Sequence, residues 1–173
     1  MSQPGPKPSD ARWRLEGDAL DAVGLRVAVQ RIGAGAWQAQ GALRSWGVAG
    51  LHRDGDTLFV PCADDEALWI GAWPEPAGLT GTVSLCAPGD VRRARIELPR
   101  EQAIAALPGG CPITRPAAQP QHELLLTLES PAVAPVHIGL TILSPGVWTA
   151  RAGRAWTPLV GPPPLPPRLG RRR

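Results

Sequence analysis

The residues of this chain with the widest chemical repertoire are three histidines and three cysteines, namely His52, His122, His137, Cys62, Cys86 and Cys111. Zinc ligands recur at spacings of a few residues, and no two of these six residues lie that close in the sequence. We therefore predict no metal site and no resident cofactor. We expect the three cysteines to behave as small buried apolar residues.

Recognisable catalytic motifs do not accompany these residues. The segment 43–47, Leu-Arg-Ser-Trp-Gly, lacks the first glycine of the G-x-S-x-G nucleophile turn. The chain also has no P-loop and no G-x-G-x-x-G that opens a helix. We therefore predict no catalytic residues. This favours a protein without catalytic activity and leaves an enzyme with an unrecognised site as the third alternative.

Tryptophan is the distinctive residue type, because the chain has seven Trp, one Phe and no Tyr. A Trp usually buries its ring and keeps one polar edge near water, so we expect roughly four or five in the core and about two on a binding face. Trp and Arg dominate the energetics of protein interfaces. The Trp residues predicted to bind a partner are Trp69, Trp73, Trp148 and Trp156.

A second candidate for binding is the segment 162–173, which contains four arginines and no acidic residue. Without those arginines, 14 basic residues face 15 acidic ones in a chain whose net charge is +3. Pro163, Pro166 and Arg168 fit the spacing of proline-rich segments that dock on aromatic grooves as polyproline II rods. The three final arginines are too few for strong binding to phosphates, so we do not expect nucleic acid as a partner.

Alternation of apolar and polar residues with period two is typical of a half-buried strand and is clearest in 25–30. We expect this strand to form a hairpin with 37–43. Asp54-Gly55 between the apolar runs 46–51 and 57–60 predicts another hairpin, with Gly55 at positive φ as in a type I′ turn. The remaining predicted strands are 68–73 and the pairs 79–86 with 91–98, 123–129 with 136–143, and 147–150 with 154–156.

Glycine and proline, with 20 and 21 residues, are too frequent for long helices. The one predicted helix is 100–107, between Pro99 and a Pro-Gly-Gly stop. About nine or ten short strands at regular spacing indicate an all-β fold. We predict an antiparallel β-sandwich with at most one short helix, and a small β-barrel as the alternative.

The predicted organisation is a disordered leader at 1–11, a single β domain at 12–161 and a Pro/Arg-rich tail at 162–173. The chain has no apolar leader and no apolar run of roughly 18 residues, so we expect no membrane span. Three cysteines without paired spacing fit a reduced compartment. We expect a cytoplasmic location.

The function that these patterns favour is that of a non-catalytic accessory or structural subunit that binds another protein through its Trp-bearing strands and its tail. A second copy of the chain is an alternative partner. A carbohydrate- or small-ligand-binding module is the alternative function. Two coplanar exposed Trp beside carboxylates or amides would favour a sugar, whereas a flat apolar patch would favour a protein.

Overall fold

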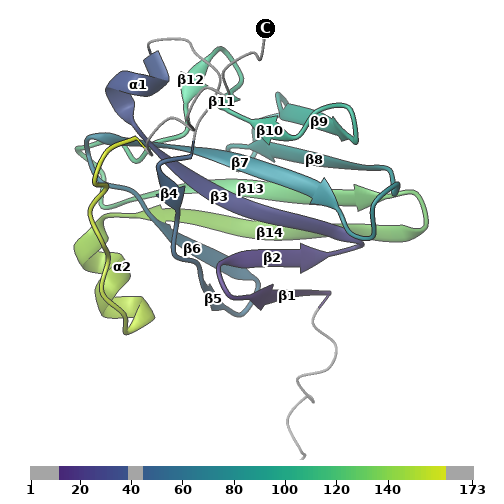
Figure 1. Ribbon diagram of the computed structural model, residues 1–173, viewed down its shortest axis with the longest axis horizontal. Helices are drawn as coiled ribbons and strands as arrows, with labels where there is room; N and C mark the ends of the chain where they lie inside the picture. Colours follow the sequence, from purple (N-terminus) through teal and green to yellow (C-terminus); the bar gives the residue numbers. More distant parts are fainter. Residues whose placement is uncertain (1–11, 39–44, 163–173) are drawn as a thin grey trace, which may run out of the picture.

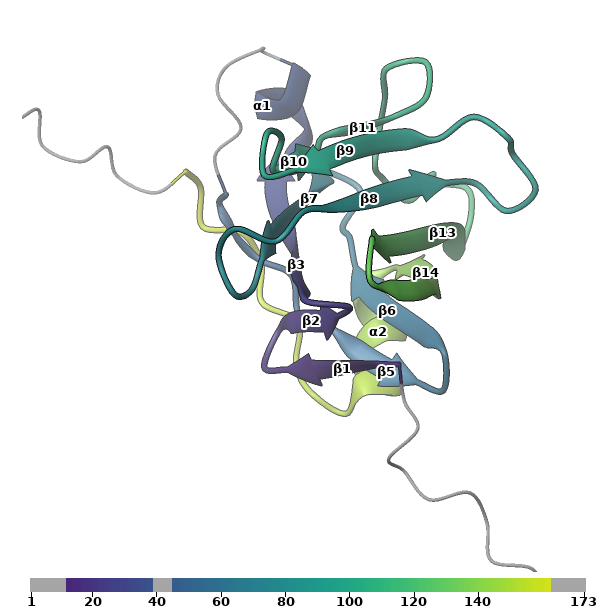
Figure 2. The ribbon, with the colours of Figure 1, turned by 90° about the vertical axis from the view of Figure 1, so that its right-hand side faces the viewer.

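The computed structural model describes residues 12–38 and 45–162, which form two six-stranded sheets that face each other (Figures 1 and 2). Sheet A has the order β1 (Trp13–Glu16), β2 (Ala19–Ala22), β3 (Leu25–Gly33), β7 (Glu66–Pro74) and β10 (Ala103–Ile104), with β4 (Gly47–Val48) also paired to β3. Sheet B has the order β5 (His52–Asp54), β6 (Thr57–Pro61), β14 (Val133–Leu143), β13 (Gln121–Ser130), β8 (Gly81–Cys86) and β9 (Ala94–Leu98). The all-β sandwich class is therefore confirmed.

The core lies between the two sheets, because alternate residues of each strand point inward. Leu25, Val27 and Val29 of β3 are each 1% exposed and pack in one cluster with residues of β13 and β14. A Cβ on Gly81 of β8 would lie 2.9 Å from Leu25 Cδ2 and 2.9 Å from the carbonyl oxygen of Glu129. Glycine at this position therefore allows the two sheets to approach closely.

Two of the predicted hairpins are confirmed, namely β8–β9 and β13–β14. The hairpin at Asp54-Gly55 also forms, but its first strand is β5 and not the predicted 46–51, because Gly47–Val48 pairs with β3 in sheet A. Asp54 pairs with Thr57, so Gly55 and Asp56 form a two-residue loop. Gly55 has a φ of 58°, and Val23 is the one described non-glycine residue with a positive φ. The positive φ at Gly55 is therefore confirmed, but the turn has the pattern of type II′ and not type I′.

The strand at 25–30 has other partners than we predicted. β3 pairs with β2 on one side and with β7 on the other. Trp37 belongs to the helix α1 (Ala34–Gln38), and the rest of the predicted strand 37–43 lies almost entirely outside the described residues. One pair in sheet B is parallel, between β6 and β14. Residues 62–132 separate these strands, so no tight turn dictates their direction.

The helices are not where the sequence predicted one. Residues 100–107 contain β10 and β11 (Ala106–Leu107), and β11 pairs with β12 (Cys111–Pro112). The predicted strand 147–150 is part of the helix α2 (Pro145–Ala152). Pro145 begins this helix because its fixed φ suits the first helical position, and Gly153 ends it at a φ of 66°. No helix in the described part of the chain is long and apolar enough to cross a membrane.

Candidate binding face

The outer face of sheet A, which points away from sheet B, carries a row of large polar and aromatic side chains. The register pairs Arg14 with Asp21, Asp21 with Arg26, and Arg26 with Trp73. Residues that oppose one another in an antiparallel sheet point to the same face. Their neighbours Leu20, Val27 and Ala72 belong to the core, so this row points outward.

A second row lies parallel to the first and contains Val48, Gln30 and Trp69, because Gln30 pairs with both of the others. Between the rows the sheet presents only small residues, since Gly71 pairs with Ala28 and with Ala103. We call the set Trp69, Gly71, Trp73, Ala28 and Ala103 the aromatic face.

Both indole rings of the aromatic face reach over Gly71. A Cβ at Gly71 would lie 3.1 Å from Cζ3 of Trp69 and 3.7 Å from Cζ3 of Trp73. Trp73 is 38% exposed, whereas Trp69 is half-buried and its indole N–H has no acceptor among the described residues. The two rings and the small residues between them therefore form a ridged surface on which a flat apolar group can stack.

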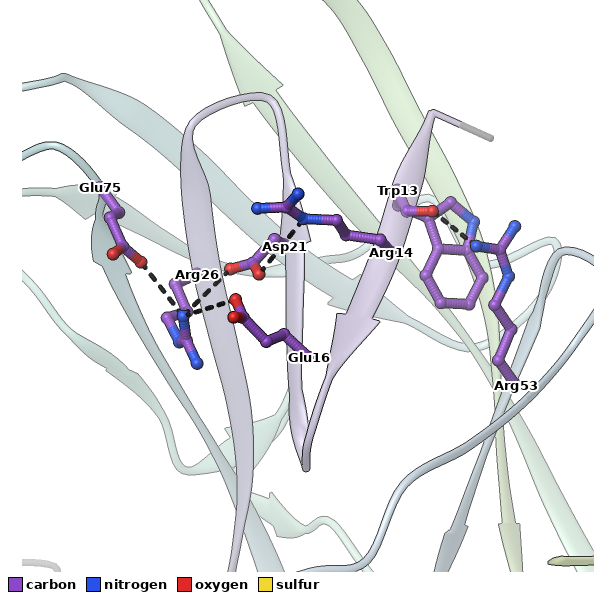
Figure 3. Close-up of polar contacts among 7 residues, drawn as sticks. All are labelled: Trp13, Arg14, Glu16, Asp21, Arg26, Arg53 and Glu75. Carbon is purple, nitrogen blue, oxygen red and sulfur yellow. Dashed lines mark hydrogen bonds and ion pairs between the residues drawn. The ribbon is translucent and has the colours of Figure 1, made fainter. Parts of the chain in front are cut away.

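Beside Trp73, one guanidinium is shared by three carboxylates (Figure 3). Arg26 Nη1 lies 3.3 Å from Glu16, 3.4 Å from Glu75 and 3.8 Å from Asp21. Arg14 Nε lies 3.7 Å from Asp21 on its other side. We call Arg26 and its three carboxylates the Arg26 cluster. The side chains of Glu16 and Glu75 are 62% and 60% exposed, so both carboxylates can also bind a cation from outside.

The carboxyl group of Asp21 is the least hydrated member of the cluster, with its side chain 17% exposed. Burial raises the pKa of Asp21 above its ordinary value, Arg26 opposes the rise, and the neighbouring Glu16 adds to it. The raised pKa of Asp21 therefore reflects its burial more than repulsion from Glu16, and Arg26 and Arg14 both act against the rise.

A cleft of about 330 Å³ adjoins the cluster and is lined by Arg12, Trp13 and the β2–β3 turn among others. That turn consists of Val23 and Gly24, with φ values of 49° and 77°. Positive φ is costly for a β-branched residue, by roughly 1–3 kcal/mol. Val23 packs against the core, which offsets part of this strain.

At Trp13, the first residue of β1, Arg53 from β5 covers the free edge of the strand, as Figure 3 shows. Arg53 Nη1 donates a hydrogen bond of 2.5 Å to the carbonyl oxygen of Trp13, and its guanidinium lies 3.9 Å from the centre of the Trp13 ring. This contact occupies a carbonyl to which another strand could otherwise pair. The outer face of sheet A is thus a more accessible surface than this edge.

Of the seven residues that the sequence nominated for partner binding, the structure brings Trp69 and Trp73 together. Trp148 is 2% exposed and packs against Phe59 and Leu143, while Trp156 is half-buried beside the same cluster. Their predicted cross-strand pairing is wrong, because Trp148 lies on α2 and Trp156 follows it without belonging to a strand. The other three nominated residues, Pro163, Pro166 and Arg168, lie outside the described residues.

The histidines and cysteines are dispersed over the fold. His137 Nδ1 lies 3.1 Å from Thr127 Oγ1. The described residues contain no group of three His, Cys, Asp or Glu that could hold a metal ion. Cys62 is buried as expected, and burial raises its pKa to about 11. Cys111 is exposed, contrary to our prediction, because it lies in the short β11–β12 pair outside both main sheets.

Sequence reasoning missed the Arg26 cluster, because its members come from β1, β2, β3 and the residue after β7. The one signal available was the outward phase of Arg26 in an alternating strand. No known family model matches the chain, and no characterised protein or solved structure matches it either. What the chain does must therefore be inferred from the chemistry of these two surfaces.

Proposed function

We propose that this chain is a non-catalytic domain that binds another protein through the aromatic face and the Arg26 cluster. The observation that carries the proposal is Trp73, which is 38% exposed on an inner strand of sheet A and directly opposite Arg26. β3 holds the backbone of β7 at Trp73, while β10 pairs with β7 only at Ile70 and Gly71, so the position of Trp73 is fixed by the sheet before binding. Trp and Arg are also the residue types most enriched at interface hot spots.

The surroundings of Trp73 fit the usual anatomy of a protein interface, with an apolar centre and a polar rim. Val48 and Leu79 are 49% and 39% exposed. Val48 lies in the same outer row as Trp69, and Leu79 packs beside Gly24 at the end of the β2–β3 hairpin. The carboxylates of Glu16 and Glu75 supply a rim of exposed charge.

A carbohydrate ligand is the second candidate, and a specific observation favours it. Two Trp residues share one face, Trp69 lies opposite the amide of Gln30, and Trp73 lies near the carboxylates around Arg26. Sugar rings stack on indoles and bond to such amides and carboxylates. We prefer the protein partner because additional aliphatic side chains are exposed around the same face.

Site-specific photo-crosslinking tests the proposal. A photoreactive amino acid placed at position 73 of the full chain should give a discrete crosslinked protein in the native host. The same amino acid at position 91 should not, because Val91 is 91% exposed in the loop between β8 and β9. Both of these strands belong to sheet B (Figure 2). The identical set of products at both positions would contradict the proposal.

Once a partner is identified, Trp73→Ala should weaken its binding by about 2 kcal/mol, or roughly 30-fold. Val91→Ala is the matched control and should leave the affinity unchanged. If Trp73→Ala instead abolishes binding to a glycan array and changes no protein complex, the carbohydrate alternative holds.

A further inference from the structure

A cleft that the proposed function does not use lies at the segment that follows α2. It measures about 230 Å³, and Trp148, Arg154 and Trp156 line it together with Arg31 of β3 and Gly50. None of its lining residues also lines the cleft beside the Arg26 cluster. Figures 1 and 2 show α2 and the segment after it along the border of the sandwich. The cleft is therefore a separate concave site on the described part of the chain.

Each arginine of this cleft stacks on one of its tryptophans. Cζ of Arg154 lies 5.1 Å from the centre of the Trp148 ring, and Cζ of Arg31 lies 5.2 Å from the centre of the Trp156 ring. Such cation–π contacts hold both partners in place, and Arg31 is also bound by the carboxylate of Glu66. The walls are therefore formed before any ligand arrives, which lowers the entropy lost on binding.

Two indole N–H groups of the cleft lack an acceptor. Nε1 of Trp148 and Nε1 of Trp156 are shielded from water and make no hydrogen bond to any described residue. Trp148 is 2% exposed, and an unpaired N–H on so buried a side chain is unusual. A Cβ at Gly50 would lie 2.9 Å from Cζ2 of Trp148 and 3.2 Å from Nη2 of Arg154. Because Cζ2 and Nε1 are both bonded to Cε2, the N–H edge of Trp148 adjoins Gly50 and Arg154 at the wall of the cleft.

The free hydrogen-bonding groups of the side chains in the cleft are mostly donors. Nε and Nη1 of Arg154 bond to no described residue, since its bonds to Asp18 and Leu51 both use Nη2. Asp18 is the one carboxylate among the lining residues, and its Oδ1 already accepts from Arg154 and from the N–H of Leu51. Oδ2 of Asp18 is thus the carboxylate oxygen left to oppose an incoming acceptor. The cleft therefore suits a group that accepts hydrogen bonds and donates none.

A carboxylate with a short carbon chain fits these conditions. It carries about four acceptor sites and no donor, and its bonds to a guanidinium are charge-assisted. Phosphate also only accepts, but Arg31 and Arg154 are already paired with Glu66 and Asp18, so the cleft cannot balance a second negative charge. At about 230 Å³ the cleft is smaller than the sites of drug-sized ligands. The apolar residues of its lining are Val48, Pro61 and Ala155.

We propose that this cleft binds a small monocarboxylate, whose carboxylate group accepts from Arg154 and from the indole N–H groups of Trp148 and Trp156. Two sources share this chemistry, namely a free short-chain acid and the C-terminal carboxylate of a peptide. The inference does not depend on the aromatic face, so either site can fail its test without the other.

Indole ¹H–¹⁵N spectra of the full chain, titrated with sodium butyrate, test the site. The Nε1–H signals of Trp148 and Trp156 should shift along a saturable curve, with a Kd on the order of millimolar. Trp69 is the internal control, because its N–H also lacks a described acceptor but belongs to the aromatic face. Butyramide has the same shape without the charge and should bind about tenfold more weakly.

The tripeptide Ala-Ala-Val separates the two sources of the carboxylate. If it binds more tightly than butyrate while its C-terminal amide does not bind, the ligand is the C-terminus of a peptide. If it binds more weakly than butyrate, the ligand is a free acid.

Arg154→Met should weaken butyrate binding about tenfold, and Arg151→Met is the matched control. The side chains of Arg151 and Arg154 are 44% and 46% exposed, and both stack on an aromatic ring. If Arg154→Met fails to fold, Trp156→Phe replaces it, since it removes one donor and keeps a ring against Arg31. Unshifted indole signals, equal binding of butyramide, tighter binding of inorganic phosphate, or unchanged affinity in the folded variants would each overturn the inference.

Discussion

Arg26 offers one guanidinium to carboxylates from three separate segments of the chain. Exposed ion pairs stabilise a fold by about 1 kcal/mol or less, and Glu16 and Glu75 are mostly exposed. The cluster is therefore better suited to recognising a charged partner than to holding sheet A together. Of the three carboxylates, Asp21 has the most buried side chain, so a pKa shift of Asp21 is the way to measure the electrostatics of the cluster.

Asp21 should make the stability of the fold depend on pH in a characteristic direction. Burial raises its pKa above 3.8, so the folded state keeps a proton on Asp21 where the unfolded chain has released it. Ionising Asp21 then costs stability as pH rises through this range. The unfolding free energy of Asp21→Asn relative to the natural chain should therefore increase between roughly pH 3 and 7, measured by urea denaturation.

Asp90 supplies a matched control with the opposite sign. The backbone N–H of Arg92 and then its guanidinium lower the pKa of Asp90. Its stabilising charge is present above the ordinary pKa of 3.8 and is lost as pH falls through the lower folded value. The relative stability of Asp90→Asn should therefore decrease as pH rises. If the relative stability of Asp21→Asn also decreased as pH rises, the pKa of Asp21 would not be raised in the folded protein.

Thiol reactivity separates the three cysteines. The thiolate is the reactive form, and the pKa of Cys62 is raised to about 11 by burial. Cys86 is also buried, and Cys111 is exposed. Iodoacetamide at about pH 8 should therefore modify one thiol per native chain quickly, and Cys111→Ser should remove that reaction, as read by intact mass. Rapid modification of two thiols would contradict this assignment.

At the scale of elements, periodicity predicted the long strands well, and it predicted the right partners for the hairpins β8–β9 and β13–β14 but not for β3. β3, β7, β13 and β14 alternate or are strongly apolar, and all four were expected as strands. Local patterns cannot reveal that β6 and β14 run parallel, because that pairing depends on residues far apart in the sequence. Residues 147–150 were expected as a strand, although a proline such as Pro145 also begins helices, and the burial of Trp148 against Phe59 favours the helix.

One part of the candidate site, the pair Trp69 and Trp73, was predictable from the sequence, and the other part, the Arg26 cluster, was not. Trp69 and Trp73 were nominated as residues of one strand, and their shared outer face follows from a period of two. The Arg26 cluster was not predictable, because its carboxylates meet only through the registers of β1, β2, β3 and β7. The β2–β3 turn was missed as well, since Val at positive φ is not a turn signal.

The contact between the two sheets predicts unequal effects of glycine substitutions. Gly81→Ala should destabilise the fold by about 1–3 kcal/mol, because its Cβ would lie 2.9 Å from the Glu129 carbonyl oxygen and from Leu25. Gly146→Ala in α2 meets nothing within 4 Å and should be neutral or stabilising by about 0.5 kcal/mol. Thermal denaturation of both variants checks this, and equal midpoints would mean that Gly81 does not separate the layers.

At the scale of the molecule, a buried ion pair ties the segment after α2 to sheet A. Arg31 and Glu66 are 6% and 3% exposed and make a bidentate contact, with 3.2 Å between Nε and Oε2. Arg31 also holds Thr157, and Arg154 holds the same segment through Asp18 at 2.5 Å. These contacts hold the segment that follows α2 against sheet A.

Substitutions of Arg31 and Glu66 should distinguish two effects of this pair, its contribution to the stability of the fold and its hold on the segment after α2. Glu66→Ala leaves Arg31 buried without its counter-charge and should cost about 3–5 kcal/mol in urea denaturation. Replacing both partners, with Arg31→Met and Glu66→Leu, should cost less because no charge stays buried. Amide hydrogen exchange at Trp156 should nevertheless accelerate in the double variant, since Thr157 has lost its donor. Unchanged exchange at Trp156 would mean that the contacts of Arg154 hold the segment without Arg31.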